Sequence, residues 1–167
     1  MKNIQIIRVL PVLAWLCCCT SSFSQQMEYF LSMDSIQGSS TSAAYKNQIA
    51  VSGFYYGATN YAVNAGSTVA GKSSFSSLTI QKEIDKSSPI LAQSAAAGTA
   101  YQKAVLTVLR DGVVFYSVTL TGCYVSGLST TGDASSTTEL VSISYSAATW
   151  KFGATQAGYN FASQVKQ

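Results

Sequence analysis

The stretch Lys82-Glu83-Ile84-Asp85-Lys86-Ser87-Ser88-Pro89-Ile90-Leu91 joins a predicted strand to the most convincing helix pattern in the sequence. Residues 75–82 (FSSLTIQK) show a strand pattern. Ser88 is expected to accept hydrogen bonds from free amides as the N-cap, and Pro89 suits the first helical position, where its missing N–H costs nothing. The apolar residues that follow reach Gly98, a natural C-terminal stop. We therefore predict one short apolar helix that plugs a sheet or packs on it.

Two segments before this stretch show the period-2 alternation of half-buried strands. They are residues 27–34 (MEYFLSMD) and 48–56 (QIAVSGFYY). Each places aromatic or aliphatic side chains on one side, and such alternation is typical of a strand with one buried face. The residues on that side are Tyr29, Leu31, Met33, Ile49, Val51 and Tyr55.

Three further segments after the helix have strand patterns: residues 101–110, 113–125 and 139–150. Asp111-Gly112 separates the first two, and Asp-Gly between strand patterns is a strong hairpin signal, because a type I′ turn needs positive φ at both central residues. Many antiparallel strands plus one helix predict a mainly β domain, either a barrel or a sandwich, with a helical plug.

Two segments rich in Gly, Ser, Ala, Thr and Asn interrupt the strands. They are residues 57–74 and 126–138, and both are predicted as flexible loops. Loops as long as the first are uncommon inside compact domains and are often functional. The polar faces of the strands carry Ser and Thr in place of Lys and Glu. Charged side chains normally prevent the edge of one sheet from pairing with another, so these uncharged surfaces favour association.

The first 24 residues have the order of a signal peptide. Lys2 and Arg8 precede an apolar run over residues 9–19, which is too short to cross a bilayer, and small polar residues follow. Ser22 and Ser24 suit the −3 and −1 positions, so we expect cleavage before residue 25 and a secreted protein, periplasmic or extracellular, without a stable membrane anchor. Lipidation at Cys17, Cys18 or Cys19 is disfavoured, because no Gly, Ala or Ser precedes them.

Residues 25–167 are predicted to form a single domain. The whole chain has ten Lys and Arg against seven Asp and Glu, and loss of Lys2 and Arg8 leaves a net charge of +1. That balance gives no electrostatic reason to bind nucleic acid. Cys123 is the one cysteine after the leader, so no intramolecular disulfide is expected, and we interpret it as a buried small apolar residue.

The sequence contains no histidine, which excludes Ser/His/Asp and Cys/His nucleophilic sites and histidine-ligated metals. Glu83 and Asp85 form the one close carboxylate pair on a predicted strand face, and acids so placed are usually solvated or capping. We predict that the protein is not an enzyme and has no catalytic residue, metal site or cofactor.

The opening stretch resembles a family signature. It is similar to K-x-I-D-K-S-[ST]-P-x-L of the haemolysin-coregulated protein (Hcp) family, the inner-tube component of type VI secretion systems. Residues 49–57, Ala70-Gly71-Lys72, residues 104–107 and Gly158-Tyr159-Asn160 resemble further family segments, so the resemblance covers nearly all of residues 27–163. The signature residues are Lys82, Ile84, Asp85, Lys86, Ser87, Ser88, Pro89 and Leu91.

Membership would imply an antiparallel two-sheet β-barrel with one short helix, which assembles into hexameric rings that stack into a tube. The lumen would hold secreted effector proteins, and spike and sheath components would be partners. The resemblance also places residues 57–74 at the family's ring-stacking loop, with Tyr61, Gly71 and Lys72 as its contact residues.

The chain departs from the family in three respects. Residues 43–46 lack the family's histidine, Tyr61 and Val63 stand in a loop that is usually glycine-rich, and tube proteins typically have no signal peptide. A second hypothesis is therefore an exported relative that binds ligands or surfaces outside any secretion machine. Its contact patch would be aromatic, formed by Tyr55, Tyr56 and Tyr61.

Overall fold

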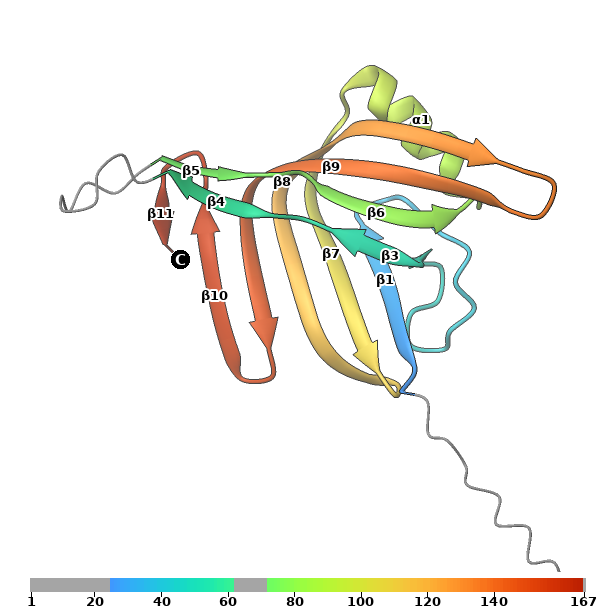
Figure 1. The fold of residues 1–167 in the computed structure, drawn as a ribbon, viewed down its shortest axis with the longest axis horizontal. Coiled ribbons are helices and arrows are strands. Elements are labelled where there is room, and N and C mark those ends of the chain that lie inside the picture. Colours follow the sequence, from blue (N-terminus) through green and yellow to red (C-terminus); the bar gives the residue numbers. More distant parts are fainter. Residues whose placement is uncertain (1–24, 62–71, 167) are drawn as a thin grey trace, which may run out of the picture.

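The computed structural model describes residues 25–61 and 72–166 (Figure 1). The predicted leader, residues 1–24, lies outside the described residues, and so does Gly71 of the predicted stacking loop. For Tyr61 and Lys72 the backbone is described and the side chains are not.

The described residues form strands and a single helix. The helix is α1 (Ser88–Ala97), and Gly98 ends it with φ of 64°, as the sequence predicted. The strands are β1 (Met27–Met33), β2 (Ile49–Val51), β3 (Gly53–Tyr55), β4 (Ala58–Tyr61), β5 (Lys72–Phe75), β6 (Leu78–Glu83), β7 (Ala100–Arg110), β8 (Val113–Gly132), β9 (Thr137–Phe152), β10 (Thr155–Asn160) and β11 (Val165–Lys166).

Nine strands form one antiparallel sheet with the order β11-β10-β9-β8-β7-β1-β2, and β6 pairs with both β9 and β3. Figure 1 shows β10, β9, β8, β7 and β1 side by side, and β3 and β6 crossing them as a second layer. The long strands β8 and β9 curve from the first layer into the second, below α1. The predicted mainly β fold with one short helix is confirmed.

Ser52 links the two layers. It separates β2, which pairs with β1, from β3, which pairs with β6, and its N–H donates to the Gln81 carbonyl at 2.8 Å. Hydrogen bonds between strands do not close the sheet into a barrel, because β2 and β3 do not pair with each other. The backbone at Ser52 connects these two strands. The single strand predicted over residues 48–56 is therefore two strands with a break between them.

One apolar core lies between the layers and below the helix. Alternate side chains of each strand point into it, as the pleat of a strand requires. Burial of each large apolar side chain stabilises the fold by about 1.5–3 kcal/mol. The fully buried members include Leu31, Met33, Ile49, Leu78, Ile80, Leu91, Leu106, Val118, Leu120, Val125, Val141 and Ile143.

The Asp-Gly hairpin turn is confirmed, because Asp111 and Gly112 have φ of 51° and 77°. The loop predicted over residues 126–138 is wrong, since β8 runs to Gly132 and β9 begins at Thr137. The turn between them is short because Asp133 Oδ1 accepts hydrogen bonds from the amides of the second and third residues after it. The ends of the loop predicted over residues 57–74 also pair, as β4 with β5.

Candidate functional site

Lys82, near the end of β6, is a charged residue with a side chain that is only 1% exposed. Its Nζ lies 2.8 Å from Glu139 Oε2 and 2.9 Å from Asp85 Oδ1. The same ammonium donates to Ser88 Oγ at 2.9 Å and to the Glu83 carbonyl at 2.7 Å. A buried charge without partners is very costly, so these contacts are what allows Lys82 to remain inside. We call Lys82, Asp85, Ser88 and Glu139 the buried ionic cluster.

Ser88 has a different role from the predicted one. The N-cap position belongs to Ser87, whose side chain makes no capping hydrogen bond, and Ser88 is the first helical residue. Its hydroxyl accepts a hydrogen bond from the Asp85 amide at 3.0 Å and donates to Glu139 Oε2 at 2.5 Å. The prediction of Ser88 as N-cap was wrong because the helix already includes Ser88, and its hydroxyl oxygen accepts hydrogen bonds from the Lys82 ammonium and the Asp85 amide instead of from amides of the helix.

Asp85 holds the turn between β6 and α1. Its Oδ1 accepts a hydrogen bond from the Ser87 amide at 3.0 Å, and its Oδ2 accepts one from the Ser39 amide at 2.9 Å. Desolvation raises the pKa of Asp85, but the hydrogen bonds from Ser87 and Lys82 together outweigh it and leave the pKa below its ordinary value. The carboxylate is therefore ionised at neutral pH, and the cluster contains two acidic side chains for one ammonium.

The other signature residues divide between surface and core. Lys86 is exposed and its Nζ donates to Asn47 Oδ1 at 3.0 Å, while Ile84 is 52% exposed. Pro89 occupies the first turn of α1, as predicted, and Leu91 is completely buried beneath the helix. The signature thus fixes the passage from β6 to α1 and anchors α1 in the core.

Glu139, which was absent from the sequence-based site, completes the cluster from β9. It is 3% exposed and pairs with Lys82 across the β6–β9 ladder. A signal for it existed, because Glu139 alternates in step with Val141 and Ile143, which predicts an inward side chain. Spacing along the chain cannot reveal its partner 57 residues away.

Few other described residues could act in catalysis or bind a metal ion. Glu83 is exposed, while Asp85 is already engaged by the cluster. Cys123 is 1% exposed, and burial raises the pKa of its thiol to about 11, which confirms its interpretation as a buried apolar residue. Among residues 25–61 and 72–166, no group of three His, Cys, Asp or Glu residues suits a metal ion.

Tyr55 and Tyr56 point in different directions. Tyr55 is 67% exposed, whereas Tyr56 is half-buried and its hydroxyl lies 2.5 Å from that of Tyr116. Burial is the main cause that raises the pKa of Tyr116, followed by this hydrogen bond. The backbone of Tyr61 pairs with Lys72 at the outer end of the β4–β5 ladder. Tyr55 is thus on the surface while Tyr56 packs against the apolar core, so the two residues do not share one patch.

Comparison with known proteins adds to this geometry. The model of the family described as "Type VI secretion system effector, Hcp" matches residues 30–152. The fold is similar to the crystal structure of Hcp1 from Salmonella typhimurium, with a TM-score of 0.76 and 25% identity over 84% of this chain and 99% of that chain. No curated protein matches the chain.

Two further solved structures are similar. One is described as a type six secretion system protein, with a TM-score of 0.77 and 25% identity over 85% of this chain and 100% of that chain. The other is a type VI secretion system effector from Yersinia pestis, with a TM-score of 0.68 and 22% identity over 79% of this chain and 98% of that chain. The family match spans most of the chain, including the buried ionic cluster, and the chain therefore belongs to the Hcp family of type VI secretion tube proteins.

Proposed function

We propose that this chain is a non-enzymatic, structural subunit of a type VI inner tube that assembles into hexameric rings. The observation that carries the proposal is the family match over residues 30–152, which includes the whole strand-to-helix signature. A subunit of this kind needs no cofactor. Its partners would be copies of itself, effector proteins held in the lumen, and the spike and sheath.

The surface supports self-association. Large apolar side chains on several elements are exposed, and Tyr55, Tyr124 and Leu140 lie on strands of the second layer among Ser and Thr side chains. A monomer that kept these side chains in water would forgo their burial, and uncharged strand surfaces do not repel a second copy. Within this proposal the signature residues have a structural role, and Tyr61, Gly71 and Lys72 remain the proposed contacts between stacked rings.

The assembly itself provides the direct test. Protein that lacks residues 1–24 is expected to form closed rings of about six subunits, because cyclic symmetry satisfies every copy of a subunit-to-subunit contact. Light scattering coupled to size exclusion, over a dilution series, measures the mass of the particle. A clean monomer at high micromolar concentration would contradict the proposal.

The predicted leader adds an export route to the proposed function. Residues 1–24 have the order of an export signal, so we propose that the protein is secreted through the general export route and begins at residue 25. Mass spectrometry of protein from native cells is expected to find Gln25 at the N-terminus. An intact Met1 would instead indicate the cytoplasmic route that a tube loaded inside the cell requires.

The same leader keeps the second function open. A protein that folds outside the cytoplasm cannot enter a cytoplasmic tube by the usual path, so an exported relative would act on its own as a binding or surface protein. Neighbouring genes for sheath and spike components would favour the tube, and their absence would favour the independent protein.

A further inference from the structure

Strands β4 and β5 form a two-stranded ladder, which we call the arm, and they pair with no other strand of the described structure. Ser76 fixes the base of the arm. Its amide donates to the Gly57 carbonyl at 3.0 Å, and its hydroxyl accepts a hydrogen bond from the Gly57 amide at 2.7 Å. Because an isolated two-stranded ladder is only marginally stable in water, the arm needs support from another part of the chain. Figure 1 shows β10 and β11 beside it.

Phe75, the last residue of β5, makes the apolar contact between the arm and the rest of the domain. The centroid of its ring lies 4.1 Å from that of Phe161, 5.8 Å from that of Tyr159 and 6.1 Å from that of Trp150. Aromatic rings at such distances attract one another in addition to burying apolar area. Phe161 is itself fixed to the sheet, because its amide donates to the Ser146 carbonyl at 2.8 Å. The Phe161 ring therefore connects the arm to the main sheet.

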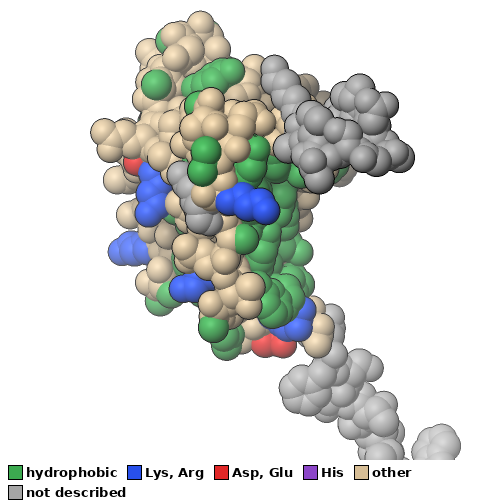
Figure 2. Space-filling view, turned by 90° about the vertical axis from the view of Figure 1, so that its left-hand side faces the viewer, with side chains coloured by type: hydrophobic (Ala, Val, Ile, Leu, Met, Phe, Trp, Pro, Cys, Tyr) green, Lys and Arg blue, Asp and Glu red, His purple; other side chains and the backbone are tan. Residues whose placement is uncertain are grey.

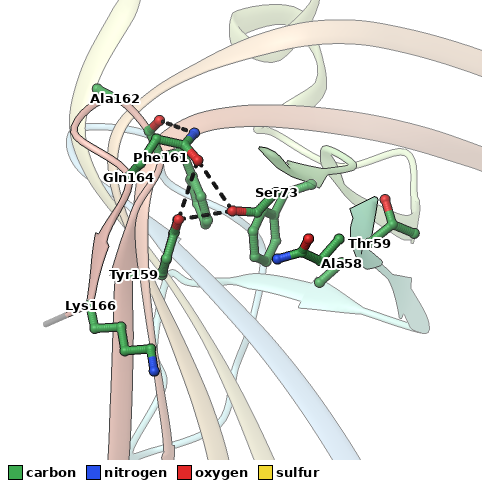
Figure 3. Close-up of a pocket in the computed structure, with 10 residues that line it drawn as sticks. Ala58, Thr59, Ser73, Tyr159, Phe161, Ala162, Gln164 and Lys166 are labelled. Atoms are coloured by element: carbon green, nitrogen blue, oxygen red, sulfur yellow. Dashed lines mark hydrogen bonds between the residues drawn. The ribbon is translucent and has the colours of Figure 1, made fainter. Parts of the chain in front are cut away.

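A second contact between the arm and the β10–β11 hairpin is polar. The hydroxyls of Ser73 and Tyr159 lie 2.8 Å apart, and both are 3.4 Å from Gln164 Oε1. Figure 3 shows these three side chains pointing toward one another. A hollow of about 1050 Å³ lies beside them, between the arm and the hairpin. The arm is thus held at a few points and is not packed along its length, so each contact provides much of its support.

The turn after β10 holds Gln164 toward the arm. Asn160 Oδ1 accepts hydrogen bonds from the amides of Ala162 and Ser163, both at 3.0 Å. Gln164 follows with φ of 58°, a left-handed conformation that is uncommon for a residue with a side chain. Its side-chain amide donates to the Phe161 carbonyl at 3.1 Å. Backbone strain of this kind persists only where the surroundings fix it, and it is concentrated at functional positions.

The contacts that hold the arm are uncharged. Both ion pairs among the described side chains belong to the buried ionic cluster, which lies elsewhere in the fold. Figure 2 faces this end of the molecule and shows mainly uncharged side chains with scattered basic ones. Release of the arm therefore separates rings and hydroxyls, and it breaks no ion pair of the described side chains.

We propose that the β10–β11 hairpin is a latch that positions the arm of the same chain, through Phe161 on its apolar side and Tyr159 on its polar side. With the latch closed, the β4–β5 ladder is ordered and has one direction. With the latch released, the ladder loses its support and frays. The inference rests on the proposed function for what the arm contacts, since its outer end holds the backbone of Tyr61 and Lys72, the proposed stacking residues. The latch thus controls how these two residues are presented.

Tyr159→Phe tests the latch. Phenylalanine keeps the ring beside Phe75 and removes the hydroxyl that contacts Ser73 and Gln164. The measurement is hydrogen exchange, followed by mass spectrometry, of the amides of residues 57–61 and 72–76 in the purified protein. Exchange of these arm amides is expected to become about 5-fold faster, because one hydrogen bond of ordinary strength no longer opposes local opening.

Tyr101→Phe is the matched control, because the Tyr101 hydroxyl also pairs with a serine hydroxyl, that of Ser94 in α1. It is expected to leave exchange of the arm amides unchanged. Ser73→Ala removes the same contact as Tyr159→Phe from the side of the arm, so the double variant is expected to exchange more slowly than the product of the two single effects predicts. Equal acceleration by Tyr101→Phe, no acceleration by Tyr159→Phe, or fully multiplicative effects would overturn the latch.

Light scattering on the same samples separates this inference from the proposed assembly. Hexamers with unchanged exchange of the arm amides in Tyr159→Phe overturn the latch alone. Monomers in which Tyr159→Phe accelerates exchange of the arm amides overturn the hexamer alone, because the latch lies within one chain. A loss of particle mass in Tyr159→Phe without faster exchange of the arm would show that this hydroxyl acts at a contact between subunits, and it would also overturn the latch.

Discussion

Lys82→Met is expected to destabilise the folded protein by about 3–5 kcal/mol. Methionine keeps the length and volume of the side chain but removes the ammonium from Glu139 and Asp85. The Glu139 carboxylate, 3% exposed, is then left buried without its cation. Removal of one partner from a buried pair costs more than the pair contributed, because the remaining charge stays desolvated. Urea denaturation of protein that lacks residues 1–24 measures the loss.

Lys86→Met is the matched control, since it is the same substitution four residues along the signature. Lys86 is exposed and its Nζ contacts only the Asn47 side chain in the described structure, so its loss is expected to change the free energy of unfolding by less than about 1 kcal/mol. Protein concentration must be equal in both experiments, because assembly contributes to apparent stability. Equal losses from the two variants would show that the buried ionic cluster does not stabilise the fold.

The buried ionic cluster also shows what the sequence could and could not predict. The stretch 82–91 was sufficient for the end of a strand, the start of a helix and the resemblance to a family. The sequence did not show why position 82 requires a charged residue, because the main partner of Lys82 is Glu139 on the distant strand β9. Local rules placed Ser88 as a cap, but its hydroxyl oxygen accepts hydrogen bonds from Lys82 and from the Asp85 amide, and the helix begins one residue earlier than predicted.

The strand predictions succeeded and failed for one physical reason. Alternation identified most strands of the core, because one face of each meets apolar neighbours. Residues 126–132 have no such alternation, yet they continue β8 because β9 lies beside them and pairs through Thr130↔Glu139. Backbone pairing depends little on side-chain type once a partner strand is fixed by the core.

Leu91→Ala is expected to lower the free energy of unfolding by about 2–5 kcal/mol. Leu91 is completely buried and is the apolar anchor of α1 in the core, so truncation leaves a cavity below the helix. Ile90→Ala is the matched control, because Ile90 is the preceding residue of the same helix, has the same size and is 43% exposed. Its loss is expected to cost less than about 1 kcal/mol, since alanine also has the better helix propensity. Urea denaturation of the two variants at one concentration makes the comparison. If both variants lose the same stability, the helix does not depend on its buried face, and the signature must act through the turn at Asp85 alone.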